Sequence, residues 1–339
     1  MRSPPSGSPC GALAASRVGS ASAGVHDQQM GPRVSLPALV VPALLGVALL
    51  TLSGCGSPVP PPAPATVASS AVPVAADPQP SKVLVVVEEN HTAASALHEM
   101  PYLAGLAGDY GQTTDYRAVA HPSLPNYLAL AGGSTFGVTD DADPSSHRIT
   151  GNSVFDSALA AGRTAKNYAE AMPAPCALTS EGRYGVKHNA WAYFSDPTSR
   201  SNCQRFDVPA GTTTSGPLRT DLDAGALPTI GELIPDLCHD GHDCSLGTAD
   251  DWLRQWIPVV MAGPDYRSGH LAIVVTFDED DESGPNTVLT TVVAPHVTQM
   301  RSTSRLTHYS LSRYFAELTT TPPPREAASA PSLRQAFGI

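Results

Sequence analysis

Two apolar, β-branched runs of the sequence each lead into a cluster of acidic residues, and this pairing limits the possible folds more than any other feature. Residues 83–87 read VLVVV and lead into EENH at 88–91. Residues 271–277 read LAIVVTF and lead into DEDD at 278–281. Continuous β-branched runs are typical of strands that are buried on both faces, as in parallel sheets. The two runs therefore predict central strands of an α/β sheet.

The acidic clusters predict a metal site. Ligands of open parallel α/β sheets bind beyond the carboxyl ends of the strands. If the two runs lie in one sheet, their acidic clusters meet at that edge. Carboxylates that are packed together repel one another, and a cation relieves the repulsion. We therefore expect a divalent metal ion there, whose identity the sequence does not give.

Strand-like and helix-like segments alternate along residues 81–320, which we predict to form one domain, followed by a C-terminal tail at 321–339. Such alternation predicts a mainly parallel sheet with helices on both faces. Residues 195–220 are polar and read as a surface excursion. The expected strands are 83–87, 165–169, 271–277 and 287–294, and the expected helices are 95–107, 126–131, 153–161, 229–237, 250–256 and one from about His308.

The N-terminal part of the chain has the features of an export signal. Residues 34–54 are uncharged and apolar after a basic flank, and LSGC at 52–55 resembles a bacterial lipobox. This order of features is typical of secretory signals. We expect residues 1–55 to be a prefix and a lipoprotein signal with lipidation at Cys55, and a membrane-spanning anchor is the alternative. The Pro- and Ala-rich residues 56–80 predict an extended linker between the signal and the domain. With the export signal, we expect the domain to lie outside the cell, either attached to the outer face of the membrane or released.

Four cysteines fall within the predicted domain, and an even number in an exported domain predicts disulfides. Three pairings are possible, and we expect the one that closes the shorter loops, Cys176–Cys203 and Cys238–Cys244. A zinc site at Cys238 and Cys244 is the alternative, but the five residues between them exceed the usual spacing of roughly two to four. The net charge of −11, without a stripe of Lys or Arg, argues against nucleic acid as a partner.

Ser123 stands just before an expected helix. It precedes Leu124-Pro125, and the helix is expected from about Asn126. A capping serine is the commonest reason for this pattern. The same geometry suits a phosphate, because a helix N-terminus offers free N–H groups. A serine there attacks phosphorus only if a base or a metal activates its hydroxyl, and the acidic clusters would supply that metal.

Four segments together resemble the motifs of a known family. They are ENH at 89–91, HPSLPNY at 121–127, KHNAWAYF at 187–194 and DEDD at 278–281. They resemble the bacterial phosphoesterases of the alkaline phosphatase superfamily, which include acid phosphatases and phospholipases C, and most of all the small secreted acid phosphatases of actinobacteria. The resemblance covers nearly all of 82–318. It implies an alkaline-phosphatase-like α/β fold and hydrolysis of phosphate monoesters, with phosphoinositides among the candidate substrates.

The resemblance also implies roles for individual residues. It points to Ser123 as the nucleophile and to a hydrogen bond from Asn126 to a phosphoryl oxygen, although Asn126 is equally expected as a helix-start residue. It places a catalytic histidine at His188, and an imidazole suits protonation of a leaving oxygen near neutral pH. The metal ligands that it implies are Glu89, Asn90, Asp278 and Glu279.

Further polar residues have several open readings. Asp240 and His242, in the densest polar run of the chain, and His308 could hold a second metal, bind phosphate or fill a disulfide-closed loop. His121 is a candidate hydrogen-bond partner of the site residues. A phospholipase C-type phosphodiesterase and a non-enzymatic, cation-binding lipoprotein are the alternative functions. A serine esterase is disfavoured, because no Gly-x-Ser-x-Gly motif surrounds Ser123.

Overall fold

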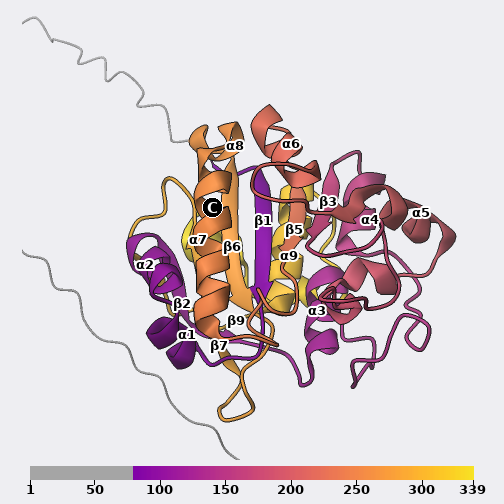
Figure 1. Ribbon diagram of the computed structural model, residues 1–339, viewed down its shortest axis with the longest axis horizontal. Coiled ribbons are helices and arrows are strands. Elements are labelled where there is room, and N and C mark those ends of the chain that lie inside the picture. The colour runs from indigo at the N-terminus through magenta and orange to yellow at the C-terminus, as the bar shows by residue number, and fades with distance from the viewer. Residues whose placement is uncertain (1–78) are drawn as a thin grey trace, which may run out of the picture. The chain divides into compact units, whose positions relative to one another are not determined.

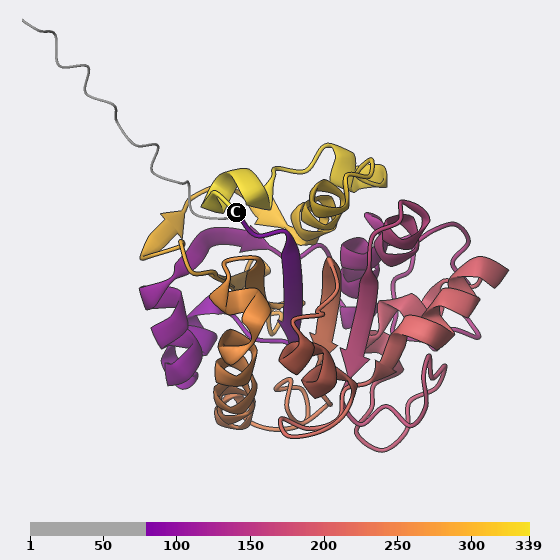
Figure 2. The same cartoon turned by 90° about the horizontal axis from the view of Figure 1, so that it is seen from above.

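The computed structural model describes residues 79–339, which form one nine-stranded sheet with helices on both faces (Figures 1 and 2). Its strands are β1 Lys82–Glu88, β2 Gly111–Arg117, β3 Ala165–Ala169, β4 Asp207–Pro209, β5 Ile230–Ile234, β6 Leu271–Phe277, β7 Thr287–Val293, β8 Met300–Ser302 and β9 Leu306–Thr307. Their order is β4-β3-β5-β1-β6-β7-β2-β8, and β9 pairs with β2. All pairs are parallel except those of β7 with β6 and β2. The predicted fold class is confirmed.

The helices form two layers, one on each face of the sheet. Figure 2 shows α7 on one side and α9, with α10 near it, on the other. The helices are α1 Ala93–Glu99, α2 Pro101–Asp109, α3 Ser123–Gly132, α4 Val154–Ala160, α5 Pro197–Phe206, α6 Pro217–Ala224, α7 Leu246–Ala262, α8 Pro264–Arg267, α9 His308–Thr319 and α10 Leu333–Phe337, with 3-10 turns η1 Val186–His188, η2 Ala190–Tyr193 and η3 Arg325–Ala328.

The two β-branched runs lie side by side at the centre of the sheet. In β1 the side chains from Val83 onward are buried, and in β6 all are, as expected for strands covered on both faces. The strands are in register, with Glu88 opposite Phe277. The backbone N–H of Asp278 donates to the carbonyl oxygen of Glu88 at 3.0 Å. Both acidic clusters therefore start at the same level of one sheet edge, at the bottom of Figure 1.

The helix predicted over 229–237 is wrong, because this segment contains strand β5. Pro228 and Pro235 limit the segment to a length that suits a strand better than a helix. The close packing of β5 against β3 also requires a glycine at position 231, since a Cβ there would lie 2.5 Å from the carbonyl oxygen of Lys166. The helix predicted over 95–107 is divided into α1 and α2 at Pro101.

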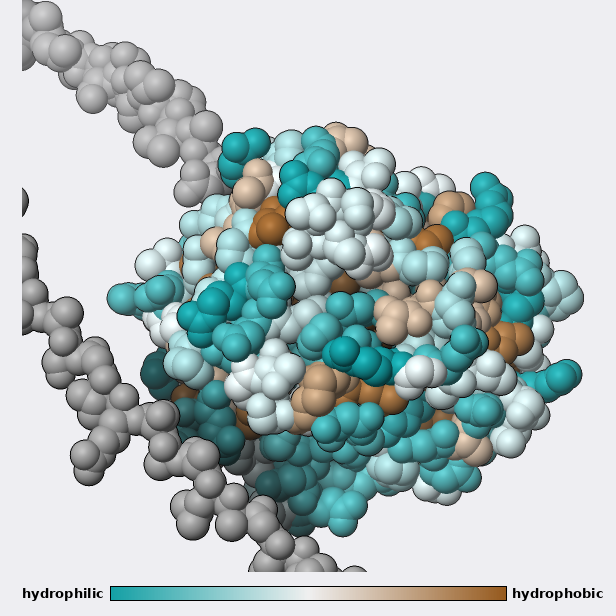
Figure 3. Space-filling view, viewed as in Figure 1, coloured by the Kyte–Doolittle hydropathy of each residue, from teal (hydrophilic) through white to brown (hydrophobic). Residues whose placement is uncertain are grey.

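The C-terminal residues 321–339, expected as a tail, contain η3 and α10. Leu333, Phe337 and Ile339 are buried in the same hydrophobic core as the sheet. The predicted signal segment, Cys55 and nearly all of the linker lie outside the described residues. Within residues 79–339, no helix has both the length and the apolar character needed to cross a bilayer. Hydrophobic surface in Figure 3 is confined to small separate areas.

A buried carboxyl group in β5 makes the stability of the fold pH-dependent. Glu232 is 3% exposed, and its Oε1 atom has no hydrogen-bond partner. Burial, reinforced by the charge of Asp207, raises the pKa of Glu232 to about 8, against about 4.3 in an unfolded chain. The folded protein therefore keeps this proton at pH values where the unfolded chain has lost it. The resulting stability is complete below about pH 4 and is lost as the pH rises to about 8.

We expect Glu232→Gln to reduce this pH dependence. The wild-type free energy of unfolding should fall as the pH rises from 5 to 8. Glu232 should account for up to about 1.4 kcal/mol of this fall per pH unit. The glutamine has no proton to lose, so the variant's curve should be flatter by that amount. Urea unfolding at several pH values measures both curves, with the exposed Glu181→Gln as the control. Equal slopes in wild type and Glu232→Gln would contradict the assignment.

Candidate active site

Ser123 and the two acidic clusters meet at the carboxyl edge of β1 and β6. The Ser123 Oγ atom lies within hydrogen-bond distance of two carboxylate oxygens, 3.1 Å from Glu89 Oε2 and 3.3 Å from Glu279 Oε1, and donates its one hydrogen to either. Ser123, Glu89 and Glu279 are all buried, and none is more than 4% exposed. Glu89 follows β1, Glu279 follows β6 and Ser123 begins α3. The structure thus brings the predicted nucleophile and two predicted metal ligands into one cluster.

Ser123 is not the helix cap that its sequence position suggested. Pro122 is the N-cap residue of α3, and Ser123 is the first residue with helical conformation. The hydroxyl of Ser123 contacts side chains of Glu89, Glu279 and Lys187 and caps no backbone N–H. A capping serine would be held by its own helix, whereas this hydroxyl is directed into the acidic cluster.

Asn90 and Asp278 complete the set of predicted ligands. The backbone N–H of Asn90 donates to Asp278 Oδ1 at 3.3 Å, and that of Glu279 donates to the same oxygen at 2.6 Å. The amide group of Asn90 lies between Glu89 Oε2 and Asp278 Oδ1, and with its nitrogen toward them it donates at 2.8 and 3.1 Å. With its oxygen toward them, three oxygens would converge, an arrangement that a shared cation stabilises.

The charges of this cluster also fit a cation. Burial raises the pKa of Asp278 well above its usual value, and the charges of Glu89 and Glu279 raise it further. Burial and the charge of Glu89 likewise raise the pKa of Glu279 to about 8. The Oδ2 atom of Asp278 is buried without a hydrogen-bond partner. Three carboxylates and an amide oxygen form a donor set that suits a hard divalent cation, so Glu89, Asn90, Asp278 and Glu279 could hold the predicted metal.

His188 lies behind Glu89 and does not face open space. Its Nε2 atom is 3.0 Å from Glu89 Oε1 and its Nδ1 atom 3.1 Å from Asp240 Oδ2. The ring is 2% exposed and stacks on Tyr127, whose hydroxyl donates to Glu89 Oε1 at 2.6 Å. Burial alone would lower the pKa of His188, but the two carboxylates outweigh it and raise the pKa to about 9. The predicted proton-donor role does not fit this position, since the ring is buried and a carboxylate lies within 3.1 Å of each ring nitrogen.

Asn126 also takes a different position from the one predicted. Its Oδ1 atom accepts the backbone N–H groups of Val119 and Ala120 at 2.8 and 3.0 Å. Its Nδ2 atom donates to the carbonyl oxygens of Ala120 and Pro122 at 2.9 and 3.3 Å. Both ends of the amide are thus used by the loop that leads to Ser123, and Asn126 holds this loop in place rather than facing a phosphoryl oxygen.

Lys187 and Asp141 are site residues that the sequence reasoning missed. The Lys187 Nζ atom lies 3.3 Å from Ser123 Oγ and 3.1 Å from Asp141 Oδ2. Burial would lower the pKa of Lys187, but the charges of Glu89 and Asp141 raise it above the usual value. The lysine precedes His188 in one of the family-like segments, which is a usable signal. The loop around Asp141 has no comparable sequence signal.

The other predicted residues surround the cluster at different depths. His121 is exposed, and its Nδ1 atom lies 2.6 Å from Glu279 Oε2. The carbonyl oxygen of Asp240 accepts the N–H of Glu89 at 2.8 Å. His308 is buried, which lowers its pKa to about 4, and its Nε2 atom donates to the carbonyl oxygen of Asp278 at 2.6 Å. His242 contacts Lys187 at 3.2 Å. These contacts place each residue beside a predicted ligand or, for His242, beside Lys187, and a second metal at Asp240, His242 or His308 stays a prediction.

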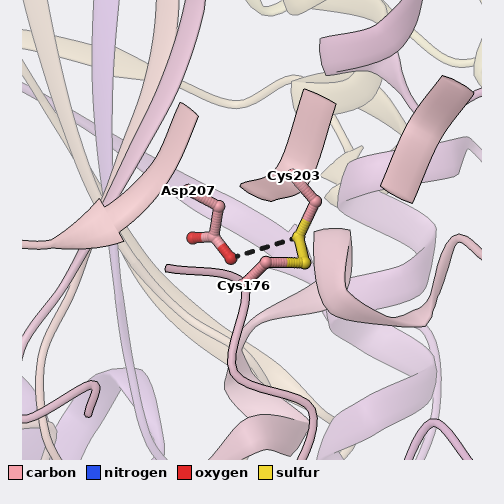
Figure 4. A group of neighbouring side chains, drawn as sticks. All are labelled: Cys176, Cys203 and Asp207. Carbon is pink, nitrogen blue, oxygen red and sulfur yellow. Dashed lines mark hydrogen bonds between the residues drawn. A yellow bond between two sulfur atoms is a disulfide. The ribbon is translucent and has the colours of Figure 1, made fainter. Parts of the chain in front are cut away.

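Both predicted disulfides are confirmed, Cys176–Cys203 and Cys238–Cys244. Figure 4 shows Cys176, Cys203 and Asp207 as one close group. Its two sulfur atoms are bonded to each other, so it offers no thiolate to a metal. The disulfide between Cys238 and Cys244 likewise excludes the alternative zinc site, and it closes the loop that carries Asp240 and His242.

Comparisons with known proteins agree with the four family-like segments. A family model described as the Phosphoesterase family matches residues 95–285. A phosphatidylinositol-3-phosphatase of Mycobacterium tuberculosis is 30% identical over 259 residues, which cover 76% of this chain and 82% of that protein. A phosphate-repressible acid phosphatase of Penicillium chrysogenum is 29% identical over 219 residues, which cover 62% of this chain and 52% of that protein. The chain thus spans about half the length of the fungal relative.

A solved structure from Bacteroides thetaiotaomicron, described under the metabolism of multiple glycosaminoglycans, has the same fold. It superimposes with a TM-score of 0.51 at 9% identity, over 77% of this chain and 82% of that chain. At this identity the likeness concerns the fold alone.

Proposed function

Because the chain belongs to the Phosphoesterase family and is a phosphoric ester hydrolase, we propose that it hydrolyses phosphate monoesters with Ser123 as the nucleophile and with a bound divalent metal. The observation that carries the proposal is the position of Ser123 Oγ, within 3.1 and 3.3 Å of two buried carboxylates from two different strand ends. A serine hydroxyl is a weak nucleophile until a base or a metal activates it, and the carboxylates of this cluster could accept its proton and hold a metal.

Glu89, Asn90 and Asp278 would hold the metal, and Glu279 lies beside them with one oxygen toward Ser123 and the other toward His121. When bound, it would lower the pKa of the serine hydroxyl and stabilise negative charge on the phosphoryl oxygens. Ser123 Oγ forms a bond to phosphorus while the bond from phosphorus to the leaving oxygen breaks, and the hydroxyl proton passes to the carboxylate of Glu279. Water then cleaves the phosphoserine, which releases inorganic phosphate and restores the hydroxyl.

We assign protonation of the leaving oxygen to His121. It is the exposed imidazole two residues before the nucleophile, with its Nδ1 atom 2.6 Å from Glu279 Oε2 and its Nε2 atom 3.5 Å from Asp280 Oδ1. A proton delivered to Glu279 therefore has a direct route to this ring, and the ring is open to solvent where that of His188 is not. His188 is then a positioning residue. It neutralises Glu89, and Asp240 fixes its ring from the other side.

The substrate and the location of the enzyme extend this proposal. The Mycobacterium tuberculosis relative is described as a phosphatidylinositol-3-phosphatase and the fungal one as an acid phosphatase, which supports phosphate monoesters and makes phosphoinositides a candidate class. The pattern around Cys55 supports export and attachment to the outer face of the membrane by a lipid.

The release of p-nitrophenol from its phosphate ester, compared with the acetate ester, tests the proposal directly. We expect the purified protein to cleave the phosphate ester alone, to lose this activity with a chelator and to regain it with a divalent metal. Cleavage of the acetate ester at a similar rate would favour a serine esterase. Binding of a cation without hydrolysis of any phosphate ester would favour a non-enzymatic lipoprotein.

His188→Ala should separate a positioning role from proton donation. We expect kcat/KM to fall by a similar factor, about 10- to 100-fold, for p-nitrophenyl phosphate and for glycerol phosphate, because the change acts through Glu89. In His121→Ala, kcat/KM for glycerol phosphate should fall about 10²-fold or more beyond any fall for p-nitrophenyl phosphate. The reason is that an alkoxide leaving group needs a proton and a nitrophenolate does not.

The control is His98→Ala, which removes an exposed histidine from α1 and should change neither substrate. If His188→Ala instead impaired glycerol phosphate selectively, His188 would be the proton donor and the assignment of His121 would be wrong.

A further inference from the structure

The ammonium group of Lys187 is held at Ser123 by three acceptors. They are Ser123 Oγ at 3.3 Å, Asp141 Oδ2 at 3.1 Å and His242 Nε2 at 3.2 Å. A lysine ammonium has three N–H donors and no acceptor, so these contacts account for all of them. The three partners come from α3, from the loop after it and from the loop closed by Cys238–Cys244. Three contacts fix the end of this long, flexible side chain, and one of them fixes the distance between the ammonium and the hydroxyl of Ser123.

The partners of Lys187 are themselves fixed. Asp141 Oδ1 accepts the backbone N–H of Leu124, the residue after Ser123, at 2.9 Å. One carboxylate therefore joins the lysine to the start of α3. The Nδ1 atom of His242 lies 2.8 Å from Asp243 Oδ1. This pairing directs the Nδ1 proton to Asp243 and leaves Nε2 free to accept from the lysine. The Lys187 side chain is 17% exposed, so the ammonium stands at the opening of the buried cluster.

Lys187 is the permanent cation of this cluster. Within residues 79–339 it is the sole lysine or arginine with a hydrogen bond to Ser123. The other basic groups in contact with the site carboxylates are imidazoles, of which His188 lies behind Glu89 and His121 lies against Glu279. A phosphoryl group bonded to Ser123 Oγ would bring one of its other oxygens next to the ammonium. The N–H that donates to Ser123 Oγ in the free site would then donate to that oxygen, and the ammonium binds phosphate as a point charge.

We infer that Lys187 gives the site its preference for phosphate monoesters over phosphodiesters, an inference that rests on the proposed function with Ser123 as the nucleophile. A monoester dianion carries two negative charges on three free oxygens, and the ammonium pairs with one of them. In a diester one of these oxygens carries an alkyl or aryl group and the phosphate has a single charge. A cation fixed at that place therefore stabilises a monoester far more than a diester.

The test compares p-nitrophenyl phosphate with bis(p-nitrophenyl) phosphate, which share a leaving group that departs without a proton. In Lys187→Met we expect kcat/KM for the monoester to fall by about 10²- to 10³-fold, the usual loss for one donor to a developing oxyanion. The diester should lose less than about tenfold, because it makes less use of the cation. The ratio of the two values should therefore fall at least about tenfold. Lys187→Gln, which still donates to Asp141 without a charge, should give the same direction if Lys187→Met folds poorly.

Lys166→Met is the matched control, because Lys166 is another half-buried lysine with a carboxylate partner, Asp221, and lies in β3. It should leave the ratio unchanged. Equal losses for both substrates in the Lys187 variants would overturn the inference while leaving the serine mechanism intact. A wild-type protein that cleaves neither substrate, or a Ser123→Ala variant with full activity, would instead refute the proposed function.

Discussion

Ser123→Ala is expected to lower kcat for p-nitrophenyl phosphate by on the order of 10⁴-fold or more, because no covalent phosphoserine can form. The hydroxyl is buried between Glu89 and Glu279, and the change to alanine removes a single oxygen atom, so it creates no large cavity. The fold should therefore persist. Steady-state kinetics measures the loss, and peptide mass mapping of acid-quenched wild-type enzyme should place the phosphate on Ser123.

Ser157→Ala provides the control. Ser157 lies in α4, and its Oγ atom donates to the carbonyl oxygen of Ser153 at 2.9 Å, so the change also removes a hydrogen-bonded serine from a helix. It should leave kcat unchanged. Near wild-type turnover in Ser123→Ala, or a phosphate trapped on another residue, would show that Ser123 is not the nucleophile.

The centre of the fold could be predicted because its strands are buried on both faces. The β-branched runs of β1 and β6 read as strands without any tertiary information, and parallel pairing then brings Glu89 and Asp278 to one edge. The strand β2 was not predicted, because GQTTDYR has a polar composition that matches no buried strand. Its place in the sheet depends on β7, β8 and β9 around it, which no local pattern reports.

The site residues likewise fall into those whose place the sequence predicted and those whose contacts it did not. Residues that directly follow a strand or begin a helix, such as Glu89, Asp278 and Ser123, were placed by their position in the chain. The orientation of a side chain depends on its neighbours in space, so the partners of His188 and Asn126 could not be read from sequence. Asp141 reaches the site through its contacts with Leu124 and Lys187, and both are products of the folded loop.

Asp278→Asn should affect metal-free and metal-bound protein in opposite directions. Burial, and then the charges of Glu89 and Glu279, disfavour the charged form of the Asp278 carboxyl group. A neutral amide of the same shape avoids both costs. In the presence of a chelator the variant should thus be as stable as wild type or more so. The same change removes a metal ligand, so metal content and phosphatase activity should fall together.

Thermal unfolding measured with and without added metal separates these effects. For wild type at a metal concentration about 100 times Kd, binding adds about 2.7 kcal/mol, which for a domain of this size raises Tm by roughly 5–10 °C. The variant should lose most of that rise. Asp281→Asn is the control, because Asp281 belongs to the same acidic run but is exposed and accepts from Ser283. If Asp278→Asn kept the metal content and the rise in Tm of wild type, the metal would be held by other residues. The reason is that a ligand which loses its charge binds its cation more weakly.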